Sequence, residues 1–229
     1  MLGAMNPLLC TFLGRIPYLR AIELMDRAVE GVASGGPPRL LLLEHEPVIT
    51  LGRRADSENL LCTEQALAAE GIELTWTSRG GDITFHGPGQ LVGYPILPVG
   101  RMVRRHVDRI FTTLEDLLLE AGIFSSFDAE NPGLWVEERK IAAVGIEIRD
   151  GVSLHGFCLN VRREHDGFRH IVPCGLAGRG VVYWSELGVA PSVPETALAF
   201  AERFAAKCGL TPVFDKNHAA PASPLRSES

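Results

Sequence analysis

The sequence predicts an α+β fold, a single domain in which a mixed sheet is flanked by helices. Apolar strands and amphipathic helices both occur along the chain, and they do not alternate in strict βαβ order. Asp150-Gly151 lies between two apolar strands, which is a strong signal for an antiparallel hairpin. No internal repeat or linker divides the 229 residues, so the length fits one domain with a sizeable core.

Four helices are expected. Apolar positions at helical spacing predict a helix over residues 18–33, which a Gly/Pro-rich segment at 34–38 ends. Residues 63–70 form a short helix between the cap Thr63 and Gly71. The clearest helix ends near Gly122, and its buried face is Val103, Val107, Ile110, Leu114 and Leu117. A last helix spans residues 194–207.

Strands are expected between these helices. The apolar segments that predict them are residues 40–43, 48–51, 72–76, 91–97, 134–136, 140–149 and 152–161. The C-terminal segment 216–229, which is rich in Ala, Ser and Pro, is expected to be disordered.

Composition excludes several classes of function. A formal net charge of −6 argues against nucleic acid as the main partner. No apolar run approaches the roughly 20 residues that span a bilayer, so no membrane association is expected. The first residues do not resemble a signal peptide, and five cysteines without paired spacing fit reduced thiols. We therefore expect a cytoplasmic protein.

Three segments carry groups suited to chemistry. Residues 79–90 form a Gly-rich polar loop, whose backbone can approach a ligand closely. Lys140 begins an apolar strand, where an amine becomes an acid or base of tunable pKa. Cys174 lies on a turn bounded by Pro173 and Gly175, where a nearby cation would make it a thiolate nucleophile. Together these segments suggest acyl transfer through a thioester.

The order of these motifs resembles one family. The sequence reads Arg-Gly-Gly-x-x-Thr-Phe-His-Gly-Pro-Gly-Gln, Lys-Ile-Ala-x-x-Gly, His-Gly-Phe-x-Leu-Asn and then Pro-Cys-Gly, which resembles the lipoyl(octanoyl) transferases from about residue 41 to 187. The resemblance implies the fold of biotin and lipoate protein ligases. It also implies a catalytic domain over residues 1–215.

The resemblance implies the site residues as well. Cys174 and Lys140 are the expected catalytic pair, with no metal and no cofactor. The substrate-binding residues that it implies are Arg79, Gly80, Gly81, Asp82, Ile83, Thr84, Phe85, His86, Ala143, Val144, Gly145, Gly156, Phe157 and Cys158. Gly145 and Gly156 would leave width for an alkyl chain. Cys158 departs from the small apolar residue expected there and puts a second thiol near the pocket.

Lys140 is unusual for its position on the strand. On a regular strand it shares a face with three apolar residues, Ala142, Val144 and Ile146. Burying an unpaired ammonium is costly, so a lysine at a strand end ordinarily extends to water. In the catalytic reading, its ammonium stabilises the Cys174 thiolate and moves protons between sulfur and amine.

Two alternatives use histidines. His165, His170 and Cys174 loosely resemble a metal set, although structural zinc usually has four ligands in tighter pairs. A dyad of Cys174 with His86, His155 or His170 would describe a thiol hydrolase. A catalytically silent relative that binds acyl chains or lipoyl domains is a further possibility.

The family resemblance implies the reaction and its partners. An octanoyl or lipoyl group passes from acyl carrier protein to a specific lysine of lipoyl domains, in 2-oxoacid dehydrogenase complexes and the glycine cleavage protein. The transfer needs no ATP, because a thioester becomes an amide. Carrier proteins are acidic, so the arginine face of the 103–117 helix is either a docking surface or a solvated face that keeps the helix soluble; its members are Arg101, Arg104, Arg105 and Arg109.

Overall fold

The computed structural model describes residues 6–129, 131–173 and 179–215. Its helices are α1 (Tyr18–Ala33), α2 (Glu64–Ala69), α3 (Val103–Glu120) and α4 (Val193–Cys208). The strands of the large sheet, in spatial order, are β11 (Thr211–Phe214), β1 (Pro7–Ile16), β2 (Arg39–His45), β6 (Gln90–Ile96), β10 (Val152–Asn160), β9 (Arg139–Arg149), β8 (Gly133–Val136) and β7 (Ser126–Asp128). A small sheet has the order β4 (Glu73–Trp76), β3 (Val48–Leu51) and β5 (Ile83–His86).

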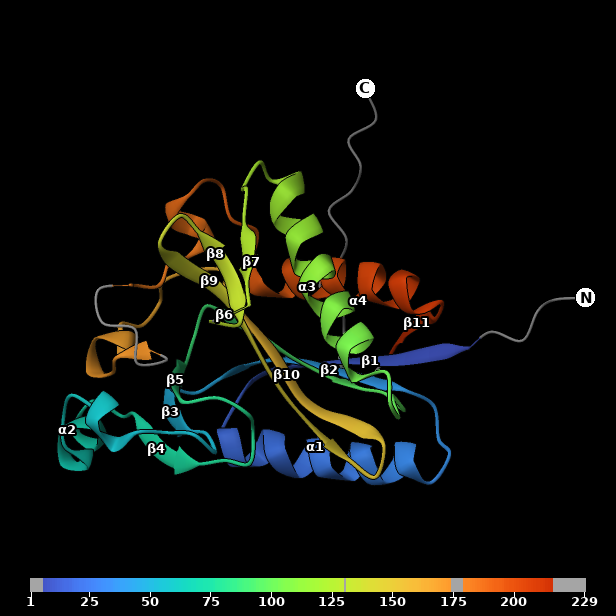
Figure 1. Cartoon of the computed structure of the whole chain (residues 1–229), viewed down its shortest axis with the longest axis horizontal. Helices are drawn as coiled ribbons and strands as arrows, with labels where there is room; N and C mark the ends of the chain where they lie inside the picture. Colours follow the sequence, from blue (N-terminus) through green and yellow to red (C-terminus); the bar gives the residue numbers. More distant parts are fainter. Residues whose placement is uncertain (1–5, 130, 174–178, 216–229) are drawn as a thin grey trace, which may run out of the picture.

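The large sheet is mixed. Strand β1 pairs in parallel with β11 and β2, whereas the pairs from β2 to β7 are antiparallel. Figure 1 shows α1 along one face of this sheet and α3 with α4 on the opposite face. The small sheet and α2 lie beside the start of α1 (Figure 1). This is the α+β architecture that the sequence predicts, a single domain with a mixed sheet flanked by helices.

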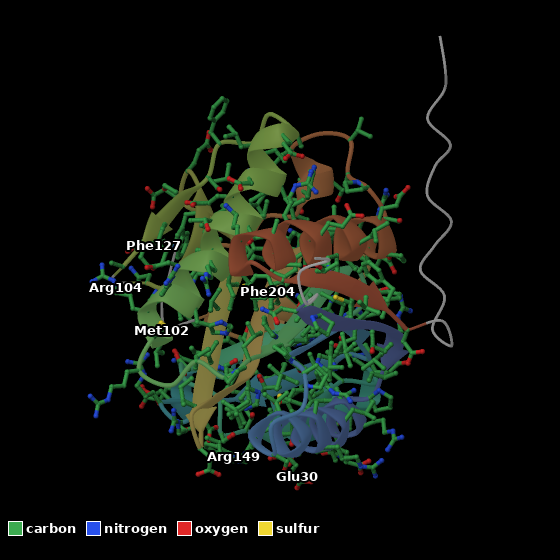
Figure 2. All side chains as sticks on the ribbon, turned by 90° about the vertical axis from the view of Figure 1, so that its right-hand side faces the viewer. Glu30, Met102, Arg104, Phe127, Arg149 and Phe204 are labelled. Atoms are coloured by element: carbon green, nitrogen blue, oxygen red, sulfur yellow. The ribbon has the colours of Figure 1, made fainter. Side chains whose placement is uncertain are left out.

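The buried apolar side chains form three clusters in the described part of the chain, one on each face of the large sheet and one at the small sheet. The largest joins the sheet to α3 and α4 and includes Ile110, Leu114, Phe200 and Phe204. Figure 2 shows Phe204 inside this layer, whereas Arg104 projects outward from α3. A second cluster joins the other sheet face to α1 through residues such as Met25, and a third lies under the small sheet around Phe85. The core is thus built by the stepped apolar faces of the helices.

Local sequence signals account for several element ends. Ser192 and Glu195 form a reciprocal capping box at the start of α4. Thr63 caps α2 through its hydroxyl, as predicted. Asp150 and Gly151 have φ values of 51° and 78°, which a two-residue hairpin turn of the primed type requires. The Asp150-Gly151 turn fixes the β9–β10 hairpin, which carries much of the site.

Four strands were not predicted: β1, β5, β7 and β11. The predicted helices and the other strands are present, with ends shifted by at most a few residues. The expected tail over 216–229 lies outside the described residues. Among the residues that the structure describes, no helix has the length and apolarity needed to cross a membrane.

Candidate active site

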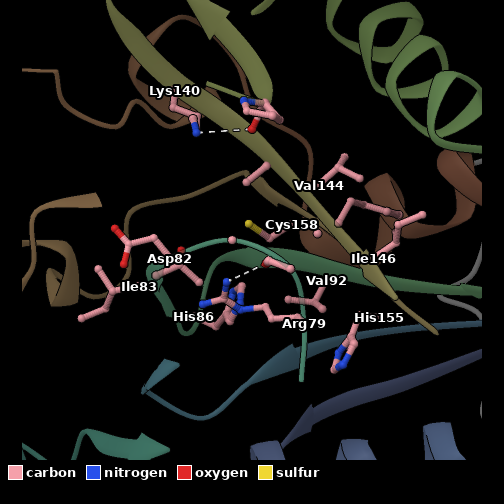
Figure 3. Close-up of a pocket in the computed structure, with 18 of the residues that line it drawn as sticks. Arg79, Asp82, Ile83, His86, Val92, Lys140, Val144, Ile146, His155 and Cys158 are labelled. Carbon is pink, nitrogen blue, oxygen red and sulfur yellow. Dashed lines mark hydrogen bonds between the residues drawn. The ribbon is translucent and has the colours of Figure 1, made fainter. Parts of the chain in front are cut away.

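A cavity of about 520 Å³ lies between the β9–β10 hairpin and the loop that leads into β5. Figure 3 shows its side chains, with Lys140 at one end and His155 at the other. Its lining residues are Tyr18, Arg54, Arg79, Gly80, Gly81, Asp82, Ile83, Thr84, His86, Val92, Tyr94, Asn131, Pro132, Lys140, Ala143, Val144, Gly145, Ile146, His155, Gly156, Phe157 and Cys158. Volume and position make it the candidate substrate site.

One wall of the cavity is the apolar surface of two paired strands. Ala143 is paired with Cys158, and Gly145 with Gly156, so the small residues of β9 and β10 lie together. A Cβ on Gly145 would lie 3.2 Å from the Gly80 oxygen, which shows how closely the loop approaches the strand there. A Cβ on Gly156 would lie 2.0 Å from the Gly93 oxygen. The missing side chain of Gly156 therefore makes room for the β6 backbone.

The opposite wall is the polar loop, which Arg79 fixes in place. Its guanidinium donates through Nη2 to the Thr50 carbonyl oxygen at 2.7 Å and to Thr50 Oγ1 at 2.8 Å. Nη1 donates to the Gly80 carbonyl oxygen at 3.2 Å. Thr50 is fully buried in β3. A forked, permanently charged side chain thus ties the Gly-rich loop to the small sheet.

Asp82 connects this loop to a neighbouring segment. Its Oδ1 accepts from the Asp56 amide at 3.0 Å, and its Oδ2 accepts from Asn59 Nδ2 at 2.7 Å. The Asn59 carbonyl oxygen accepts in turn from the Val172 amide at 2.8 Å. Asp82 therefore links the cavity to the segment that enters the Pro173-Cys174-Gly175 motif.

Lys140 faces the cavity because β9 contains a bulge. Leu134 of β8 is paired with Ala142, but the next residue, Trp135, is paired with Lys140, so Ile141 is an extra residue. Paired residues share a face, and Trp135 lies opposite to Leu134. The prediction that Lys140 shares a face with Ala142, Val144 and Ile146 was therefore wrong, because the bulge reverses the alternation.

The Lys140 side chain is 7 % exposed and has defined contacts. Nζ donates to the Pro132 carbonyl oxygen at 3.4 Å and lies 4.8 Å from the centre of the Trp135 ring. The Arg179 guanidinium lies 3.7 Å from the same ring, so Trp135 contacts two cations. These contacts hold the ammonium at one end of the cavity rather than in bulk water.

The segment before and the segment after residues 174–178 are both hydrogen-bonded near the cavity. On the entry side, the His170 carbonyl oxygen accepts from the Leu61 amide at 2.8 Å, next to the Val172–Asn59 bond. On the exit side, the Lys140 amide donates to the Gly180 oxygen and the Val182 amide donates to the Lys140 oxygen, both at 3.0 Å. Cys174 itself lies outside the described residues.

The histidines of the cavity are neutral at physiological pH. Burial lowers the pKa of His86 to about 3, helped by the nearby His45 and Arg79, and burial lowers the pKa of His155 to about 4. His86 Nδ1 lies 3.1 Å from Gln90 Oε1, and His155 Nε2 lies 3.2 Å from Ser78 Oγ. Rings of such low basicity are poor general bases near pH 7. His170 Nε2 contacts Glu70 Oε2 at 3.1 Å, and a carboxylate that orients the ring is what a triad uses, so His170 keeps the Cys-His alternative open.

The structure brings the predicted substrate-binding residues together around this cavity, with one exception. Phe85 is 1 % exposed and packs in the core of the small sheet, against the rings of His165 and Phe168. On β5, Thr84 and His86 line the cavity between this core residue and the loop. Cys158 lines the cavity, so the second thiol is present where the sequence suggested.

Sequence reasoning missed the part of the lining that comes from distant segments. These residues are Tyr18, Arg54, Val92, Tyr94, Asn131, Pro132 and Ile146, and His155 was considered only as a partner of Cys174. Tyr94 offered a signal, because it is a polar-tipped ring inside the otherwise apolar strand β6. In the described ranges no three His, Cys, Asp or Glu side chains are grouped to hold a metal ion.

Comparisons with known proteins identify the family of the chain. Residues 17–205 match the family model described as the lipoyl protein ligase A/B catalytic domain. The octanoyltransferase of Solibacter usitatus (strain Ellin6076) is 44% identical over 201 residues, covering 84% of this chain and 89% of that protein. The octanoyltransferase of Alkaliphilus metalliredigens (strain QYMF) is 43% identical over 180 residues, covering 76% and 83%.

Solved structures share the fold at low sequence identity. A putative lipoate protein ligase from T. acidophilum with bound lipoic acid has a TM-score of 0.70 at 18% identity, over 92% of this chain and 89% of that chain. Biotin protein ligase from Aquifex aeolicus has a TM-score of 0.53 at 13% identity, over 87% and 70%. The chain therefore belongs to the lipoyl protein ligase A/B catalytic domain family, and within it to the octanoyltransferases.

Proposed function

We propose that this protein transfers an octanoyl group from acyl carrier protein to a specific lysine of lipoyl domains. The observation that carries the proposal is the position of Lys140. Its ammonium is held at one end of a cavity with an apolar wall, and its own backbone binds the segment that follows residues 174–178. A nucleophile among the residues directly before that segment would meet both the cation and a bound acyl chain.

The reaction has two steps at Cys174. Its thiolate attacks the thioester carbonyl of the donor, the bond to the carrier sulfur breaks, and the carrier thiol leaves with a proton. The amine of the target lysine then attacks the enzyme thioester, loses a proton, and releases the Cys174 sulfur. Lys140 stabilises the thiolate at both stages and exchanges the protons.

The binding of the acyl chain follows from the two walls. The alkyl part lies against β9 and β10, where Ala143, Val144 and Gly145 offer apolar surface, and against Phe157 and Cys158. The loop from Arg79 to Thr84, together with His86, covers the chain from the other side.

No cofactor takes part in the proposed reaction. We place the catalytic domain at residues 1–215, and the cytoplasm is the proposed compartment because five cysteines without paired spacing fit reduced thiols.

A transfer assay tests this function. Octanoyl-loaded acyl carrier protein, enzyme and a lipoyl domain are mixed without ATP, and the mass of the domain is followed. We expect the domain to gain one octanoyl group, and a domain whose target lysine is replaced by arginine to gain none. Release of free octanoate without acylation of the domain would instead indicate a thiol hydrolase. Absence of both products would indicate a silent binding protein.

The role of Lys140 gives a prediction of its own. Lys140→Met keeps the apolar stem that lies against Gly133 but removes the ammonium. We expect the pH at which Cys174 becomes alkylated by iodoacetamide to rise and acyl transfer at neutral pH to fall at least about tenfold, because a free thiol is only a few per cent thiolate at pH 7. Intact-mass analysis after timed alkylation measures both proteins.

The other thiols provide the background for this measurement. Burial raises the pKa of Cys10 to about 12 and also raises the pKa of Cys62 and Cys208, so these thiols react slowly at neutral pH. Alkylation of the Cys174→Ala variant gives the remaining background. An unchanged pH profile in Lys140→Met, with a changed profile in His86→Ala or His170→Ala, would assign the activation to a histidine.

A further inference from the structure

The candidate acyl cavity ends against a second cavity. The second one has a volume of about 220 Å³ and opens between the start of α1 and the end of β4. Tyr18 and His155 line both cavities, and they are the side chains that the two have in common. Both side chains are buried, with exposures of 3 % and 5 %. They therefore form the partition between the two spaces.

Hydrogen bonds from two consecutive residues hold the partition. Tyr18 donates its hydroxyl to Thr77 Oγ1 at 2.8 Å, and Ser78 Oγ lies 3.2 Å from His155 Nε2. Thr77 and Ser78 follow β4 directly and themselves line the second cavity. One short segment thus fixes both rings, and fixed rings make a defined end to the first cavity.

The backbone of His155 is adapted to this position. Its φ is 57°, in the left-handed region that non-glycine residues rarely adopt, although it lies within the regular pairing of β10 with β9. Its amide donates to the sulfur of Met25 on α1 at 3.1 Å. The unusual backbone turns the ring to the α1 side, where it meets Tyr94 edge to face at 6.3 Å. Such strain is typical of functional positions.

The second cavity could hold the end of a longer alkyl chain. It is lined by Leu19, Ile22, Met25 and Trp76, which are apolar, and its rim carries the ion pair between Arg149 and Asp26 at 2.9 Å. Trp76 is 71 % exposed, so this cavity reaches the surface. In Figure 3 His155 lies at the end of the acyl cavity remote from Lys140, where the tail of a chain whose carbonyl lies near Lys140 would point.

We propose that Tyr18 and His155 set the length of the acyl chain that the protein accepts, by closing the acyl cavity against the second cavity. The inference rests on the proposed function, because it takes an acyl chain as the ligand. A chain longer than the space before the partition must displace a hydrogen-bonded ring, which costs affinity. Removing that ring would join the cavities and give the added methylene groups apolar surface.

The test compares carrier-bound octanoyl, decanoyl and dodecanoyl groups as donors. His155→Gly removes the ring and suits the positive φ. Each newly buried methylene is worth about fourfold, so we expect the decanoyl-to-octanoyl ratio of kcat/KM to rise about tenfold or more in this variant. A ratio equal to that of the wild type would overturn the inference. Failure of the wild type to transfer octanoate would instead overturn the proposed function.

A second substitution ties the effect to the second cavity. Ile22 lines that cavity but not the first, so Ile22→Phe fills it from the far side. We expect His155→Gly with Ile22→Phe to return to a preference for octanoyl, whereas Ile22→Phe alone keeps wild-type octanoyl kinetics. If His155→Gly does not fold, Tyr18→Leu opens the same partition. Persistence of the decanoyl preference in the filled double variant would show that the chain goes elsewhere.

Discussion

Cys174→Ala is expected to lose both the acyl-enzyme and the transfer of octanoate to a lipoyl domain. Removing the nucleophile from a covalent mechanism leaves only binding and positioning, which typically lowers turnover by about 10⁴-fold or more. Intact mass after brief mixing with octanoyl-carrier shows whether one octanoyl group is bound to the enzyme. Cys174→Ser should acylate slowly, because a hydroxyl is a poorer nucleophile and its ester a poorer donor.

The remaining cysteines supply the matched controls. Cys10, Cys62 and Cys208 lie away from the cavity lining, so their alanine variants should keep most activity. Cys158 does line the cavity, and Cys158→Ala should change the fit of the chain without preventing acylation. Normal transfer by Cys174→Ala would refute the thioester mechanism. Acylation that moved to Cys158 would show that the second thiol can act as the nucleophile.

Steep unfolding in mild acid is the second large effect that we expect. Burial lowers the pKa of His86 to about 3 and the pKa values of His45, His106 and His155 to about 4, against about 6.5 in an unfolded chain. The unfolded state therefore binds up to four more protons between pH 6.5 and 4, and stability is lost as the pH falls through this range. The expected slope is therefore on the order of a few kcal/mol per pH unit, against a total stability of about 5–15 kcal/mol.

Denaturant titrations at a series of pH values measure this slope, and His106 provides the control. Neither ring nitrogen of His106 has a hydrogen-bond partner in the described part of the chain, and the ring packs on Phe204 between α3 and α4. His106→Leu should reduce the slope by about 1.4 kcal/mol per pH unit. Activity at neutral pH should not change, since His106 is outside the cavity lining. An unaltered slope would mean that His106 is not a source of the acid sensitivity.

The fold was predictable where one rule governs a whole segment. Helix α3 has a continuous apolar face, and the β9–β10 hairpin has both alternation and a turn sequence. Strand β1 was missed because its residues from Thr11 to Ile16 are mostly half-buried and give little alternation. Strand β5 was missed because its four residues lie inside a glycine-rich motif that was interpreted as a loop. In each case pairing with neighbouring strands, which a sequence does not display, decides the structure.

The residues of the candidate site that belong to sequence motifs were predictable. Those that tertiary packing brings to the cavity from distant segments were not. The loop from Arg79 and the small residues of β9 and β10 were found from their motifs. Tyr18 and Tyr94 belong to ordinary helix and strand patterns, and only the fold brings them to the cavity. The prediction for Cys174 stays untested, because that residue lies outside the described ranges.

The proposed docking surface on α3 also stays a prediction. Arg101, Arg104 and Arg105 are exposed, as a docking face requires. However, α3 packs on the sheet face opposite to α1, whereas Tyr18 of α1 lines the cavity. A carrier protein bound to the arginines would therefore have to reach the cavity around the edge of the sheet. A salt-dependent loss of acylation rate in Arg104→Glu with Arg105→Glu remains the measurement that decides this.

The bulge at Ile141 changes which residues of β9 share a face: the parity of the residue numbers on each face is reversed across it. Beyond it, the odd-numbered Ala143 lines the cavity and the even-numbered Ala142 lies in the core, whereas before it the even-numbered Lys140 lines the cavity. Deletion of Ile141 would remove the bulge and restore regular alternation. If the side chains after it kept their faces, Lys140 would move from the cavity face of the strand to the core face. One residue inserted or removed at the bulge would therefore move Lys140 between cavity and core with no substitution at all. Comparisons between such chains should therefore match strand faces before they match residue identities.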